Sequence, residues 1–197
     1  MNSIILSLVL PGADLKSHQE EINELELLAN TLGYLVLEKI HQNKNKINAS
    51  TFFGKGKIES VVNICKNLDC KILIINDEIE PGHHKSIKKI CGDKISIIDR
   101  TQLILDIFNS HAKTKEAKTQ IKLATLQYML PRLVGQWTHL ERQMGGLGTR
   151  GGPGEKQIEI DRRLIRKAIS SLKNDLKKIE SHHNNQIKNR ANIFKIA

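Results

Sequence analysis

Apolar positions in the first hundred residues alternate between short continuous runs and runs with helical spacing. Residues 4–10 are almost continuously apolar, which is typical of a strand buried on both faces. Apolar residues then recur at helical spacing from Ile22 to Leu32, and Gly33 stands where a helix C-cap belongs. Ser17 and Glu20 have the spacing of a capping box, which predicts that this helix begins near Ser17.

The same alternation continues to about residue 98. Strands are predicted over 34–40, 71–75 and 95–98, with a polar loop over 42–50. Helices are predicted around the stripe from Ile58 to Leu68 and over 85–90. Strands that alternate with helices indicate an α/β fold, so residues 1–110 are predicted to form a small parallel four-stranded sheet with crossover helices.

A different pattern begins near Thr114, which is suited to be a helix N-cap. Apolar residues then follow at steps of three and four as far as Met144, with Pro131 expected to kink the helix, and the pattern resumes from Ile165 to Ile179. Two helices of about 30 residues, or ~45 Å each, pack antiparallel when a short loop joins them. We therefore expect residues 111–188 to form a long antiparallel helical hairpin, similar to a coiled coil.

The loop expected between these helices, residues 145–155, contains six of the 13 glycines of the chain. A simple helical hairpin needs one or two glycines, whereas a glycine-rich backbone allows a ligand to approach closely. Glycine amides and guanidinium groups together suit contacts with RNA phosphates and bases. The predicted RNA-binding residues are Arg142, Gly145, Gly146, Gly148, Arg150, Gly151, Gly152, Gly154, Arg162, Arg163 and Arg166.

The charge distribution supports this interpretation. The chain has a net charge of +10, but residues 1–99 carry 12 lysines, no arginine and 13 acidic residues, a net charge of −1. Residues 100–197 carry 19 basic residues, including all eight arginines, and 8 acidic ones, a net charge of +11. A strongly basic half favours a polyanionic partner, although a charged face exposed to solvent would have the same composition.

Other residue types point away from a metal or disulfide scaffold. Cys65, Cys70 and Cys91 form no C-x-x-C pair, and the histidine doublets have no partners at metal-ligand spacing. We expect buried free thiols, no metal ligands, no membrane span and a cytoplasmic protein.

One loop in the first half could bind a nucleotide. Gly54, Lys55, Gly56 and Lys57 precede a predicted helix, whose N-terminus favours an anion. The segment does not match G-x-x-x-x-G-K-[ST], because Thr51 replaces the first glycine and Ile58 replaces the hydroxyl residue. A basic turn without a ligand is the simpler interpretation, and nucleotide binding here is the weaker hypothesis.

Four segments resemble the HflX family of GTPases: residues 99–108, 126–133, 145–155 and 161–163. The segment 54–57 also matches a family motif, whereas 78–85 departs from the family pattern. The resemblance implies an N-terminal region that binds the large ribosomal subunit, with the loop 145–155 reaching ribosomal RNA. In the parent protein it implies splitting of stalled or stressed ribosomes, governed by GTP turnover in a following G domain.

That G domain would supply the P-loop and the GTP and Mg²⁺ site, and no P-loop motif occurs in the sequence. Residues 189–197 are expected to be its beginning, so this chain alone should not hydrolyse GTP. Besides a ribosome-binding region, two alternatives stay open. One is a nucleotide-binding module, for which ATP is the expected ligand, and the other is a protein-interaction module that uses the helical seam between chains. A seam used within the chain predicts a monomer.

Overall fold

The computed structural model describes residues 1–133 and 157–191, with side chains described for 159–187 in the last helix. The first half contains β1 (Asn2–Val9), α1 (Leu15–Thr31), β2 (Leu35–Asn43), α2 (Lys55–Asn67), β3 (Ile72–Ile75), α3 (Pro81–Cys91), β4 (Ser96–Asp99) and α4 (Arg100–His111). The second half contains α5 (Lys115–Met129), a turn of 3₁₀ helix, η1 (Leu130–Arg132), and α7 (Gln157–Ala191). None of the described helices combines the length and apolar character needed to cross a bilayer.

The four strands form one parallel sheet in the order β2-β1-β3-β4, which confirms the predicted sheet. β1 lies at its centre, with Ile5 opposite Lys39 of β2 on one side and Ile74 of β3 on the other. Apolar residues therefore dominate β1 and β3, because both faces of these strands are covered.

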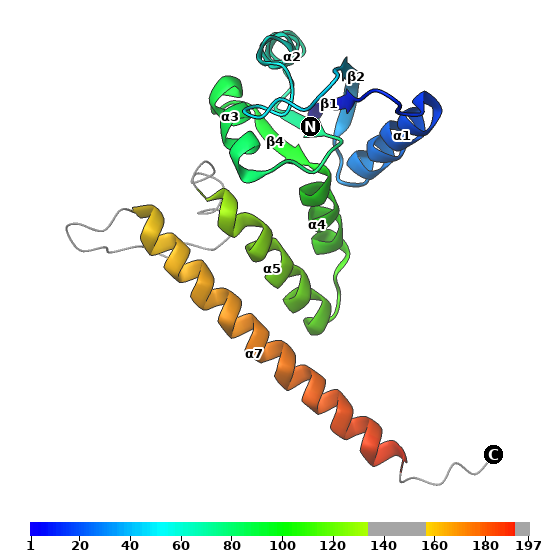
Figure 1. Ribbon diagram of the computed structural model, residues 1–197. Helices are drawn as coiled ribbons and strands as arrows, with labels where there is room; N and C mark the ends of the chain where they lie inside the picture. Colours follow the sequence, from blue (N-terminus) through cyan, green and yellow to red (C-terminus); the bar gives the residue numbers. More distant parts are fainter. Residues whose placement is uncertain (134–156, 192–197) are drawn as a thin grey trace.

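Each face of the sheet is covered by two helices (Figure 1). One core contains Ile4, Leu6, Leu73 and Ile75 with residues of α2 and α3, including Cys65 and Cys91. The core on the other face contains Ile5 and Ile74 with Leu25 of α1 and Leu103 of α4. We call residues 1–110, which contain this sheet, the α/β subdomain.

Local sequence signals explain several helix ends. Gly33 has φ +75° directly after the C-cap of α1, as its predicted capping role requires. Thr114 Oγ1 accepts the N–H of Ala117 at 3.1 Å, which confirms it as the N-cap of α5. The capping box at Ser17 was wrong: Asp14 caps α1, accepting the N–H groups of Lys16 and Ser17, because its carboxylate lies one turn earlier in the chain.

The helices α5, η1 and α7 form a second unit, which we call the arm. α5 ends at Met129 rather than continuing as one kinked helix, because Pro131 lies in η1 and cannot donate a backbone hydrogen bond. The apolar contact between α5 and α7 is made by Leu126 and Met129 of α5 and Ile165 of α7, together with Leu133, which follows η1. At the other end, His183 of α7 lies 3.7 Å from Glu116 of α5. The expected hairpin loop lies outside the described residues, so the hairpin and its coiled-coil character stay predictions.

Candidate functional site

The exposed face of α7 is basic. Ile165, Ile169 and Leu172 take the face toward α5, whereas basic residues occupy the opposite face. The exposed members of this basic face are Arg163, Arg166, Lys167, Lys173, Lys177 and Lys178. Helical spacing thus separates the apolar seam from the cations, and it presents a row of positive charge along the arm.

Three of the arginines predicted to bind RNA lie near the start of α7. Arg163 and Arg166 are exposed, and Arg162 is half-buried between the seam and the basic face. In the sequence they lie about two to three helical turns after the end of the glycine-rich segment. The other predicted RNA-binding residues lie outside the described residues: Arg142, Gly145, Gly146, Gly148, Arg150, Gly151, Gly152 and Gly154.

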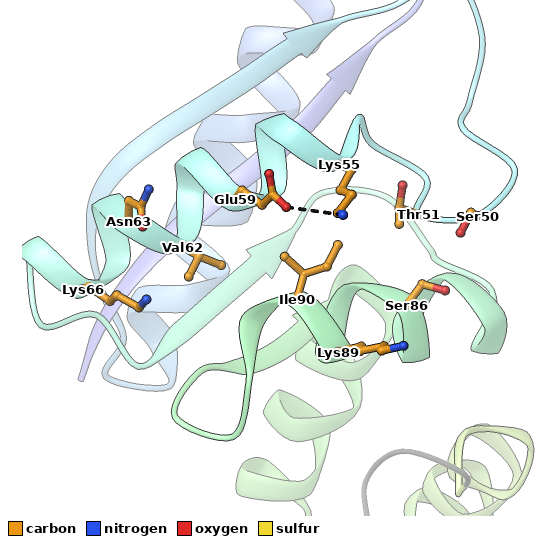
Figure 2. A pocket seen from close by; sticks show the side chains of 10 residues that line it. All are labelled: Ser50, Thr51, Lys55, Glu59, Val62, Asn63, Lys66, Ser86, Lys89 and Ile90. Carbon is orange, nitrogen blue, oxygen red and sulfur yellow. Dashed lines mark ion pairs between the residues drawn. The ribbon is translucent and has the colours of Figure 1, made fainter.

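A second cationic feature is an open hollow of about 660 Å³ between α2 and α3. Figure 2 shows the side chains of both helices that surround it. Its lysines come from three positions, Lys55, Lys66 and Lys89, and Glu59 is the acidic residue among its lining residues. The floor includes Val62 and Ile90, and the rest of the lining is polar: Ser50, Thr51, Asn63 and Ser86.

The electrostatics of this hollow favour an anion. Lys55 Nζ lies 3.7 Å from Glu59 Oε1, a long contact between two well-exposed side chains, so it neutralises little. Lys66 and Lys89 add two further cations from different helices. Such a site attracts acidic groups, while Val62 and Ile90 offer a small apolar surface beside them.

Of the predicted nucleotide-binding segment, Lys55 alone belongs to the lining residues of the hollow. Gly54 donates its N–H to Gln42 Oε1 at 2.8 Å, so this amide is already used within the protein. Gly56 and Lys57 lie in the first turn of α2. Sequence reasoning missed Lys66 and Lys89, although the spacing of Lys55, Glu59 and Lys66 places them along one side of α2.

A third polar cluster lies where the arm meets the α/β subdomain. Asp99, at the end of β4, accepts the Tyr128 hydroxyl at Oδ1, 2.6 Å away, and the Gln102 N–H at 2.9 Å. Arg132 Nη2 lies 3.5 Å from Asp99 Oδ2 and donates to the Ile79 carbonyl at 2.6 Å. This cluster was not predicted, because its members are far apart in sequence.

Two family models match the chain: the N-terminal region of GTP-binding GTPases over residues 19–109, and the middle region of GTP-binding GTPases over 111–190. The chain is 43% identical to a GTPase HflX of Alkalihalophilus pseudofirmus over 88% of its own length and 41% of the relative. It is 42% identical to a GTPase HflX of Flavobacterium psychrophilum over 99% of its length and 46% of the relative.

A solved structure has the same fold. The crystal structure of SsGBP in complex with GDP superimposes with a TM-score of 0.67 and 23% identity, over 94% of this chain and 46% of that one. The chain thus spans less than half the length of these relatives. On these matches over both halves, the chain belongs to the HflX family, in which it corresponds to the N-terminal part.

Proposed function

We propose that this chain is the ribosome-binding N-terminal region of an HflX-type GTPase. In this proposal residues 1–110 form the α/β subdomain, and residues 111–188 form a helical hairpin with its tip at 145–155. The tip and the basic face of α7 contact RNA of the large ribosomal subunit. The observation that carries the proposal is the row of exposed cations on α7, which begins with Arg163 and Arg166 and follows the glycine-rich segment in sequence.

The remaining part of the relatives' length would hold the GTP and Mg²⁺ site in the parent protein. Its turnover would govern the splitting of stalled ribosomes and release from them. The residues described here contain no cluster of ligands able to hold a metal ion, and the P-loop motif does not occur in the sequence. In this proposal Mg²⁺ and GTP bind to the parent protein, and GTP hydrolysis is not expected from this chain alone.

Co-sedimentation of the purified chain with large ribosomal subunits tests the proposal. Binding should weaken steeply with salt, because each phosphate contact releases counterions. Replacing Arg162, Arg163 and Arg166 together with Ala should weaken binding and lower the slope of log K against log salt by about 2.

A control variant separates a defined interface from general charge attraction. Lys46, Lys71 and Lys94 are exposed in the α/β subdomain, and replacing them with Ala removes the same net charge. Binding should change little in this control. Equal losses in both variants would contradict an interface on α7, and unchanged binding in the arginine variant would do so too.

The hollow between α2 and α3 supports a second candidate function, nucleotide binding. Three lysines around an open space of about 660 Å³ suit a phosphate chain, with ATP as the expected ligand. Calorimetric titration with ATP and with GTP should give a saturable signal that Lys66→Ala or Lys89→Ala reduces and Lys71→Ala does not. A flat titration of the unmodified chain would remove this candidate.

A further inference from the structure

Two residues of the arm enter the α/β subdomain at one place. Tyr128 and Arg132 lie four residues apart, at the end of α5 and in η1, so they share one face of the helix. Both reach Asp99, and Arg132 also reaches the backbone carbonyl of Ile79, between β3 and α3. We call Asp99, Tyr128, Arg132 and the backbone of Ile79 the joint.

The joint is buried and closely bonded. The side chains of Asp99 and Arg132 are 0% and 6% exposed. The Arg132 guanidinium stacks on the Tyr128 ring, 3.7 Å from its centroid, and its Nη1 donates to the Tyr128 carbonyl at 3.0 Å. Burial and the nearby Asp99 carboxylate raise the pKa of Tyr128, so its hydroxyl stays protonated and acts as a donor.

Each bond of the joint has a defined direction. Asp99 Oδ1 accepts from Tyr128, and Oδ2 lies 3.5 Å from both Arg132 Nη2 and the Ile79 N–H. Because Tyr128 and Arg132 approach different oxygens of one buried carboxylate, the two contacts fix orientation as well as distance. Because Asp99 also caps α4, the arm is bonded directly to the ends of two elements of the sheet layer.

The joint is the second point at which α5 is held. Its start follows α4 through the short segment at Ala112–Thr114, and Tyr128 lies 14 residues further on, or about 21 Å along the helix. A helix held at its first turn alone can pivot there, whereas one held at both ends has a fixed direction. α7 packs along α5, so the direction of α5 also sets that of the basic face.

We propose that the joint fixes the direction of the arm relative to the sheet, and that Tyr128 and Arg132 are the two side chains of the arm that do so. Loss of the joint would let the arm pivot at Ala112–Thr114 while both units stay folded. One consequence, the correct presentation of Arg162, Arg163 and Arg166, rests on the proposed function. The fixed direction itself does not.

The distance between two spin labels on the full chain, measured by pulsed electron paramagnetic resonance, tests the proposal. Spin labels are placed on exposed positions of the two units through Asn30→Cys in α1 and Ser181→Cys in α7. The three native thiols are buried and have raised pKa values, so the introduced cysteines react first. Circular dichroism of each variant checks that the helices remain.

Arg132→Met should broaden the distance distribution at least twofold, and Tyr128→Phe should broaden it less, because one hydrogen bond is lost and the ring remains. Tyr34→Phe, at the only other tyrosine, and Arg166→Met, on the exposed face of α7, are matched controls that should leave the width unchanged. If Arg132→Met loses its helical signal, Tyr128→Phe decides the result. An unchanged width in a folded joint variant would overturn the proposal.

Binding to large ribosomal subunits gives a separate readout. A joint variant keeps Arg162, Arg163 and Arg166, so its affinity should fall several-fold while its salt slope stays that of the unmodified chain. If the unmodified chain does not bind, the proposed function fails, yet the distance distributions still decide the joint. If the unmodified chain binds and the distance distributions of the joint variants do not change, the proposal about the joint is wrong and the proposed function is unaffected.

Discussion

A hydrogen bond joins Gln42 of β2 to Gly54, the N-cap residue of α2. The Gly54 N–H donates to Gln42 Oε1 at 2.8 Å, and Gln42 Nε2 lies 2.9 Å from where a Cβ on Gly54 would stand. Gly54 therefore allows the end of β2 and the start of α2 to approach closely. Gly56, by contrast, has no atom within 4 Å of its Cβ position.

The two glycines should respond to alanine in opposite ways. Gly54→Ala displaces the Gln42 side chain and loses its hydrogen bond, which should lower the free energy of unfolding by about 1 kcal/mol. Gly56→Ala adds a favourable helical residue in open space and should raise it by up to about 1 kcal/mol. Urea unfolding of both variants measures the difference, and equal effects would contradict these roles.

Asp106 of α4 should make the protein less stable at neutral pH. Burial raises the pKa of this carboxyl, against the hydrogen bond that Gln102 donates to it at 2.8 Å. A raised pKa in the folded state means that stability is present below the ordinary pKa and is lost as pH rises through the raised one. Asp106→Asn should therefore raise the unfolding free energy at pH 7. The gain should disappear below the ordinary aspartate pKa of 3.8, and a gain that persists there would show a packing effect instead.

His84 of α3 should make the protein sensitive to mild acid. It is 3% exposed, and burial lowers its pKa, aided by Arg132 and Lys88 and opposed by a hydrogen bond with the backbone of Ile97 and by Asp99. A lowered pKa in the folded state gives stability that is present above the ordinary value of 6.5 and lost as pH falls through the lowered one. His84→Gln should reduce the loss of unfolding free energy as pH falls, measured by urea unfolding at several pH values. His183→Gln, an exposed control, should leave this loss unchanged.

The thiols should be inert in the folded protein. Burial raises the pKa of Cys65 to about 11 and of Cys91 to about 12, and Cys70 is shifted in the same direction. Since the thiolate is the reactive form, a disulfide reagent at pH 8 should modify all three slowly. Addition of urea should make the reaction fast for all three thiols. Fast reaction of one thiol without urea would indicate local opening around it.

Elements with strong local signals could be predicted from the sequence, and those fixed by distant residues could not. Gly33 and Thr114 mark helix ends because their own backbone and side chain satisfy the end groups. α4 was not predicted, because its apolar residues follow a strand without a turn between them, and Asp99 belongs to β4 and caps α4 at once. The spacing of Lys55, Glu59 and Lys66 indicated that these residues share one side of α2, but not that this side lines a hollow.

The joint could not be predicted for a related reason. Asp99 and Arg132 are 33 residues apart, and each one alone resembles an ordinary charged residue. A buried ion pair appears in a sequence only once the fold that shields it is known. The arginine-rich start of α7 was predicted because its signal, composition, needs no fold. Its contact with RNA stays a prediction.

The central position of β1 has a consequence for the order in which the chain folds. β1 pairs with β2 through residues about 33 positions later in the chain, but its other partner, β3, lies about 69 positions later, as in the pair Ser3 and Ile72. Such long-range pairing is slow, because the intervening chain must be ordered first. During synthesis, the edge of β1 that pairs with β3 therefore stays unpaired until residue 75 has emerged, and an unpaired apolar edge favours aggregation.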